Sequence, residues 1–294
     1  MRPQSSLAMT TVRDTSARRF RQHIHRVPPI NPNYWALTLT GITDGALAHP
    51  SILTWDDLTA YPSVELACPV VCGHISTKPE NAPLMFNANW RGVPVSALLA
   101  DLELRLHAAF ANIHAADGYS TFLTLDQLRD AVLVYAMDGS PLPLEHGYPT
   151  RLIVPGLAGY KLPKWVERIE FSARHTSGTW ESRGWDSTGT LTGTRAAILN
   201  GANHAFSSRP IHLYGTAHAV SAADSSTSLI IHIDHQILAR VPISPAQSWH
   251  EWSLDWTPPH PGDFYLEIFA QYDANDPRQV AQSSVLHAMT LHVR

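Results

Sequence analysis

Residues 134–151 decide the fold, and they read VYAMDGSPLPLEHGYPTR. The stretch continues the apolar run Val132–Tyr135, which predicts a buried strand. Prolines and glycine then recur over residues 141–150 and predict a loop. A second strand is expected from Arg151 to Val154. A basic side chain, His146, therefore stands on a short loop between two strands.

Strands and helices alternate on both sides of this stretch. Residues 63–68 alternate polar and apolar side chains, which predicts a strand that ends before Pro69. Residues 95–107 carry leucines on one face and predict a helix. The other elements expected here are strands at 34–41, 120–125 and 165–171, a short helix at 51–61 and a helical turn at 126–131. Together these elements predict an α+β domain.

After about Thr176 the pattern changes to strands alone. Apolar runs recur at a spacing of roughly ten residues, with Gly, Ser, Asn and Pro between them, as in β-sandwiches. The clearest runs are 211–214, 228–233, 249–254 and 264–270. We therefore predict two domains, residues 1–190 and an all-β sandwich at residues 191–294, with residues 1–18 as a flexible N-terminal segment.

The composition excludes several classes of protein. The chain has 294 residues, of which 44% are hydrophobic and 16% charged, so it can bury a sizeable core. A net charge of −4 without a polybasic run argues against nucleic-acid binding, and no apolar run is long enough to span a membrane. The polar N-terminus lacks the apolar core of a secretory signal. As the sequence stands we expect a soluble, cytoplasmic protein, with export left open.

Cys68 and Cys72 are the two cysteines of the chain, too few for a disulfide framework. The histidines do not supply the spacing of a zinc site, so zinc is the weakest alternative. A thiolate at the end of a strand can ligate a soft metal. Cys68 ends the alternating run and is the predicted ligand, whereas Cys72 becomes the candidate if the strand runs on further. The plainer alternative for Cys68 is a half-buried core cysteine.

Five segments follow one another in order. They are Cys68, WRGVPV at 90–95, YAMDGSPLP at 135–143, HGYPTR at 146–151 and PGLAGYKLPKW at 155–165. This set resembles the molybdopterin-binding domain of the sulfite oxidase family, over residues 21–185. Residues 252–281 look like the immunoglobulin-like domain of the same family. The resemblance implies an α+β sulfite-oxidase-type domain followed by an immunoglobulin-like sandwich, through which two copies of the chain could pair.

The resemblance implies three residues at the reacting centre. Cys68 matches the cysteine that ligates molybdenum, and Arg21 matches an arginine beside the substrate. Trp185 stands where sulfite oxidases carry a tyrosine, and it has no phenolic proton to exchange. These enzymes also carry an arginine shortly after the cysteine, where this chain has Cys72, His74 and Lys78. Sulfite itself is therefore not the expected substrate.

The resemblance also implies a set of residues that hold the pterin. They are His23, Asp117, His146, Arg151, Gly156, Gly159, Lys161 and Lys164. A pterin that ends in a phosphate needs fixed cations, and Arg151 and Lys164 supply a planar donor fork and a point charge. The two glycines would let backbone N–H groups approach the cofactor closely.

We therefore expect a molybdenum–molybdopterin enzyme that moves an oxygen atom and two electrons on a small sulfur- or nitrogen-oxide-type substrate. The sequence has no C-x-x-C-H haem motif, so a separate electron-transfer protein, such as a cytochrome, is the expected partner. The alternative is a non-catalytic cofactor-binding or interaction subunit on the same fold. The altered pocket residues, Trp185 above all, motivate that alternative.

Overall fold

The structure is a computed structural model that describes residues 21–41, 43–73, 80, 83–199, 207, 209–219, 226–244, 249–272 and 285–294. The segment predicted to be flexible, residues 1–18, lies outside this part of the chain. The chain divides into two compact units, which are described separately. One unit is built from residues 19–73 and 86–191, and the main part of the other is residues 192–294.

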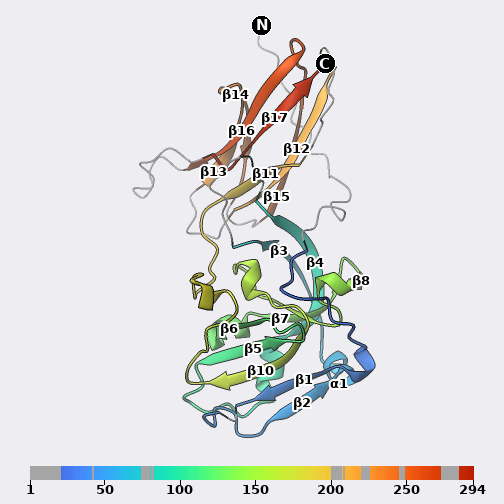
Figure 1. The fold of residues 1–294 in the computed structure, drawn as a ribbon, viewed down its shortest axis with the longest axis vertical. Coiled ribbons are helices and arrows are strands. Elements are labelled where there is room, and N and C mark those ends of the chain that lie inside the picture. Colours follow the sequence, from blue (N-terminus) through green and yellow to red (C-terminus); the bar gives the residue numbers. More distant parts are fainter. Residues whose placement is uncertain are drawn as a thin grey trace. The chain divides into compact units, whose positions relative to one another are not determined.

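The first unit contains short helices and two sheets (Figure 1). Its elements are η2 (Pro32–Tyr34), β1 (Ala36–Thr40), β2 (Ser51–Thr54), α1 (Trp55–Ala60), β3 (Val64–Val71), β4 (Met85–Pro94), α2 (Val95–Ala100), β5 (Phe110–Ala115), β6 (Ser120–Thr124), α3 (Leu125–Arg129), β7 (Val132–Met137), β8 (Ser140–Pro141), η3 (Leu144–His146), β9 (Arg151–Ile153), η4 (Gly159–Lys161), β10 (Val166–Ser172) and η5 (Glu181–Arg183). One sheet has the order β2-β1-β10-β5-β6, with β1 parallel to β10. The other has the order β3-β4-β7-β8, with β9 paired to β7.

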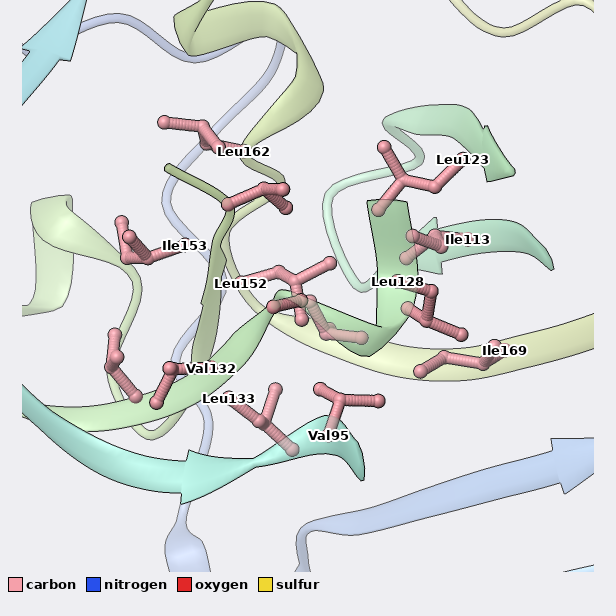
Figure 2. Close-up of a cluster of buried hydrophobic side chains, with 14 of the residues drawn as sticks. Val95, Ile113, Leu123, Leu128, Val132, Leu133, Leu152, Ile153, Leu162 and Ile169 are labelled. Carbon is pink, nitrogen blue, oxygen red and sulfur yellow. The ribbon is translucent and has the colours of Figure 1, made fainter. Parts of the chain in front are cut away.

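The core of this unit lies between the sheets and the short helices. Figure 2 shows Leu152 and Ile153 of β9 among side chains from α2, α3, β5, β6, β7 and β10. Both residues are fully buried, as are Leu133 and Ile113. Strand β9 leads directly out of the loop that carries His146, so burial of β9 fixes where that loop starts and ends.

The helix predicted over residues 95–107 ends early, at Ala100. The segment after it pairs with the chain at residues 46–48: Ala48 N–H donates to Glu103 O at 3.0 Å and Arg105 N–H donates to Ala46 O at 2.9 Å. Leu106 is fully exposed rather than on a helix face. These tertiary hydrogen bonds replace the helical ones that the leucine spacing predicted.

The strand predicted to end at Cys68 runs on to Val71, so this part of the prediction is wrong. Proline lacks the N–H that a central strand needs, and this made Pro69 look like a terminator. Among the described strands, β3 lies at the edge of its sheet, with a neighbour on one side alone. Pro69 is tolerated there, and Cys68 lies inside the strand instead of at its end.

The second unit is an all-β sandwich, as the strand spacing predicted. Its elements are β11 (Arg195–Ile198), β12 (Ile211–His218), β13 (Ser226–Ile233), β14 (Gln236–Pro242), β15 (Trp249–Trp256), β16 (Gly262–Tyr272) and β17 (His287–Val293). They form one sheet with the order β11-β12-β15 and one with the order β14-β13-β16-β17 (Figure 1). Trp252, Leu213 and Leu291 are among the buried residues between them.

Candidate functional site

Arg151 is a buried cation at the start of β9, with 3% of its surface exposed. Its Nη1 donates to His146 O at 3.3 Å and its Nη2 to Leu162 O at 3.2 Å. Its Nε has no partner among the described residues. Burial lowers the pKa of Arg151 to about 10. The guanidinium thus donates to two backbone carbonyls and lies over the ring of Trp90, 5.2 Å from its centroid, and its Nε donor is left without a partner in the described part of the chain.

Lys164 lies beside Arg151, and the two residues form an antiparallel bridge. The Lys164 ammonium donates to Glu145 O at 2.7 Å. Burial, and then repulsion from Arg151, lower the pKa of Lys164 to about 7, although Asp117 and Glu145 oppose the shift. Two partly desolvated cations therefore adjoin without a carboxylate in hydrogen-bond contact with either, among the described residues.

The turn η3 supplies backbone carbonyls to these donors. Trp165 Nε1 donates to Leu144 O at 3.0 Å, so the carbonyls of Leu144, Glu145 and His146 each accept one donor from the site. Gly147 ends the turn with φ +114°, and a Cβ there would lie 3.0 Å from Arg151 Cβ and 3.1 Å from Lys164 Cβ. Only glycine lets the turn approach both cations so closely.

His146 is itself buried, with 4% exposed, and its ring meets the ring of Phe86 edge-on at 5.6 Å between centroids. The structure thus brings together His146, Arg151 and Lys164, the three basic residues that the sequence assigned to one phosphate site. Gly156, by contrast, has φ +80° and open space where a Cβ would be. Its predicted contact with the cofactor stays a prediction.

The N-terminal segment reaches the same turn. Arg21 forms an ion pair with Glu145, and the ring of His23 lies 6.4 Å from the ring of Trp165. Asp117 accepts the Tyr119 N–H at 3.0 Å through Oδ1. Arg21 and His23 are therefore near the cationic pair, but the Arg21 guanidinium already has a carboxylate partner.

Cys68, the predicted metal ligand, points into the hydrophobic core. It is 4% exposed and belongs to the buried cluster that contains Val70, Phe86 and Trp90. Its Sγ donates to Pro69 O at 3.6 Å, and burial raises the pKa of the thiol to about 12. These are the properties of a core cysteine, the alternative that the sequence left open.

Cys72 follows directly after β3 and lies where several predicted site segments meet. Its Sγ is 3.9 Å from Gln22 Oε1, next to Arg21 and His23. A Cβ on the adjacent Gly73 would lie 2.7 Å from the ring of Tyr160 and 3.1 Å from that of Trp185. The extension of β3 to Val71 is the condition under which the sequence favoured Cys72. His74 and Lys78, the next basic residues, lie outside the described part of the chain.

Gly159 and Lys161 flank Tyr160 in η4. A Cβ on Gly159 would lie 3.3 Å from Val71 O, so the turn packs against the end of β3. The Lys161 ammonium contacts Glu181 Oε1 at 2.6 Å and Phe122 O at 2.9 Å, with its side chain fully buried. Lys161 is thus not directed at the cationic pair, and its predicted role in cofactor binding has no support in its contacts. Sequence reasoning missed Glu181, because no local pattern marks a buried partner twenty residues away.

No group of three or more His, Cys, Asp and Glu side chains among the described residues is arranged to hold a metal ion on its own. Among the same residues, no helix has both the length and the apolar character needed to cross a membrane.

The sheets and short helices of the first unit bring two adjoining cations, Arg151 and Lys164, onto neighbouring segments of one domain. Residues 24–180, more than half of the chain, match the family described as the oxidoreductase molybdopterin binding domain, and the chain belongs to this family. It is a molybdopterin-dependent oxidoreductase of the sulfite oxidase family, which confirms the resemblance drawn from the ordered motifs.

Relatives with different activities share this domain. The chain is 30% identical over 153 residues to the uncharacterized oxidoreductase YuiH of Bacillus subtilis (strain 168), covering 51% of this chain and 72% of that protein. It is 27% identical over 186 residues to the mitochondrial sulfite oxidase of Rattus norvegicus, covering 55% of this chain and 33% of that protein. With the inducible nitrate reductase [NADH] 2 of Glycine max the identity is 29% over 170 residues, covering 49% of this chain and 19% of that protein.

A solved structure extends the likeness to the second unit. The sulfane dehydrogenase SoxCD from Paracoccus pantotrophus matches with a TM-score of 0.68 and 19% identity, covering 92% of this chain and 78% of that chain. At this identity the match shows the fold alone. Together with the family match, it confirms the predicted order of a sulfite-oxidase-type molybdopterin-binding domain followed by a β-sandwich, and the first domain is mostly β.

Proposed function

We propose that this chain binds a molybdenum–molybdopterin cofactor and carries out two-electron oxygen-atom transfer on a small sulfur- or nitrogen-oxide-type substrate. The observation that carries the proposal is the pair formed by the buried Arg151 and the half-buried Lys164, next to His146 and, among the described residues, without a carboxylate in hydrogen-bond contact. Removing a cation from water without a counter-charge is unfavourable, and a bound anion would offset that cost. A phosphate of the cofactor fits this arrangement in charge and in donor geometry.

The chain's own residues would hold the cofactor at both ends. Arg151 offers its unpartnered Nε to the phosphate, and Lys164 offers an ammonium whose charged form the phosphate would stabilise. His23 would contact the pterin from the N-terminal segment. When bound, the cofactor supplies a metal that can exchange an oxygen atom and two electrons with the substrate.

We further propose Cys72, in place of Cys68, as the thiolate that the chain gives to the metal. A thiolate ligand must be deprotonated and must reach the metal. Cys68 lies in the apolar core, whereas Cys72 adjoins Gln22 and precedes the glycine packed on Tyr160 and Trp185. Arg21 and Trp185 remain the candidates to line the substrate pocket.

The reaction requires a second protein. Reduction of an S-oxide consumes two electrons and two protons, breaks the S–O bond and releases water, and oxidation of a small sulfur compound is the reverse. An electron-transfer protein, such as a cytochrome, would deliver or remove the electrons. We assign this chemistry to residues 1–190 and propose that residues 191–294 pair two copies of the chain.

A matched pair of cysteine variants tests both proposals. The chain is purified from a host that makes the cofactor, and molybdenum and released oxidised pterin are measured. We expect about one molybdenum per chain. Cys72→Ser should lose the thiolate-to-metal absorption band and turnover, while Cys68→Ser keeps both. If the absorption band and turnover were lost in Cys68→Ser alone, Cys68 would be the ligand instead. Absence of molybdenum and pterin would contradict the enzyme proposal and favour the interaction-subunit alternative.

A further inference from the structure

Three aromatic side chains form a cluster beside the strand end that carries Cys72. We call Tyr160, Trp180 and Trp185 the aromatic wall. The ring of Trp185 lies 5.0 Å from that of Tyr160 and 4.8 Å from that of Trp180, between centroids. All three residues are half-buried. Because Gly73 packs directly on Tyr160 and Trp185, the wall borders the residue that follows Cys72.

The wall presents ring surfaces instead of polar groups. The Tyr160 hydroxyl donates to Asp186 O at 2.7 Å, so it is engaged by the backbone. Nearby cations have partners of their own: Arg21 pairs with Glu145, and Lys161 pairs with Glu181. The exposed guanidinium of Arg183 lies over the ring of Trp180, at 4.9 Å from its centroid.

A buried ion pair holds the wall in place. Glu181, next to Trp180 in sequence, is 3% exposed and accepts from the fully buried Lys161 at 2.6 Å. The same carboxylate oxygen accepts from Thr121 Oγ1 at 2.6 Å. Lys161 adjoins Tyr160 in η4, and Glu181 adjoins Trp180. This one ion pair, with its contacts to Thr121 and Phe122, therefore fixes both Tyr160 and Trp180 against strand β6.

Backbone contacts also hold residues 178–189, which carry Trp180 and Trp185, in one position. Thr179 N–H donates to Ser120 O at 2.8 Å, and Ser120 N–H donates to Thr179 Oγ1 at 3.0 Å. A Cβ on Gly178 would lie 2.5 Å from Ser120 O, and one on Gly189 would lie 2.2 Å from Lys161 Cγ. The position of Trp180 and Trp185 is therefore set by packing as well as by charge.

We propose that the aromatic wall selects an uncharged or cationic substrate that carries an apolar group, and that the Lys161–Glu181 pair is its positioning element. Ring faces attract apolar groups and cations, and among the described residues the cations near the wall are either in ion pairs, as Arg21 and Lys161 are, or lie against a ring, as Arg183 does. The proposal rests on the proposed function, because it names the substrate class of the same site.

The test compares an apolar sulfoxide, methyl phenyl sulfoxide, with the anion sulfite on the cofactor-loaded protein, using dye donors and acceptors. The wild type should turn over the sulfoxide and not sulfite. Trp185→Ala and Trp180→Ala should raise KM for the sulfoxide roughly tenfold, the scale for one apolar contact, with kcat and molybdenum content unchanged. Trp185→Phe should restore most of the affinity.

Glu181→Gln tests the positioning role in the same assay. Glu181→Gln should raise KM for the sulfoxide and shift the tryptophan emission. Glu181→Asp should bring both quantities part of the way back to the wild-type values. The control is Glu103→Gln, which breaks the exposed ion pair of Glu103 with Arg105, 3.4 Å apart, and should change neither.

Two results would overturn the inference and leave the proposed function standing. One is a molybdenum- and pterin-loaded wild type that prefers sulfite, with Arg183→Ala abolishing that activity. The other is a KM for the sulfoxide that neither tryptophan variant alters. A wild type without molybdenum and pterin would instead overturn the proposed function, and this inference with it.

Discussion

Lys161 and Lys164 lie in the same short segment, yet they occupy two different environments. Burial lowers the pKa of both. Lys161 meets the carboxylate of Glu181, which supports its charge, whereas Lys164 meets a backbone carbonyl and the like charge of Arg151. The comparison teaches that a buried cation with its own carboxylate serves the fold. A desolvated cation beside another cation has no such partner among the described residues, and this is why we propose an anionic ligand there.

The largest effect is expected when the pair at Lys161 is broken. Lys161→Met leaves the Glu181 carboxylate buried and unpaired, which should cost about 3–5 kcal/mol of unfolding free energy. Urea denaturation of the cofactor-free protein measures it. The double variant Lys161→Met/Glu181→Leu should recover most of the loss, since it removes both charges. If Lys161→Met alone left the free energy of unfolding unchanged, the two lysines would not differ in the way proposed.

The environment of Lys164 predicts that the stability of the folded chain depends on pH. Its folded pKa of about 7 lies below its ordinary 10.5, so between these values the unfolded chain binds more protons. The cofactor-free protein should therefore gain stability as pH rises through this window, on the order of 2 kcal/mol after solvent screening. Below pH 7 both states carry the proton and the gain vanishes. Lys164→Met should show a flatter profile in thermal unfolding at a series of pH values.

Alanine substitutions at two glycines distinguish the cost of backbone strain from the cost of steric crowding at the cationic pair. Gly147→Ala places a Cβ at φ +114° against Arg151 and Lys164, and we expect a cost of about 2–3 kcal/mol together with lower pterin content. Gly45→Ala has a similar backbone, with φ +71° and open space for a Cβ, and Gly45 is not among the predicted cofactor-binding residues, so this variant should cost about 1 kcal/mol and leave pterin content unchanged. Equal effects of the two variants on pterin would argue against a site between Arg151 and Lys164.

The smallest effect is expected at the ion pair of Arg21 and Glu145. Their side chains are 55% and 44% exposed, so Glu145→Gln should change the unfolding free energy by about 0–1 kcal/mol. It should nevertheless free the Arg21 guanidinium. Sulfite, tested as an inhibitor of sulfoxide turnover, should then bind more tightly than to the wild type. An unchanged inhibition constant would place Arg21 away from the substrate.

Sequence patterns located the cationic pair because its parts are local. His146 ends the turn η3, Arg151 begins β9 five residues later and Lys164 lies just before β10, so spacing and motif order were enough. The ion-pair partner of Lys161 could not be predicted, because Glu181 comes from a later segment that only the folded chain brings close. The strand end at Cys68 was wrong because Pro69 stops a strand in the middle of a sheet but not at its edge. The alternation of polar and apolar residues does not show whether a strand lies in the middle of a sheet or at its edge.

The turn η3 has a consequence for the order in which the holoprotein is assembled. Its three successive carbonyls hold Trp165, Lys164 and Arg151 at fixed spacing by contacts that belong to the polypeptide itself. These contacts need no cofactor, so we expect the three side chains to lose little conformational entropy when an anion binds beside them. On the proposed function, the chain could then fold before the cofactor binds, and a chain made without molybdenum could take up the cofactor later.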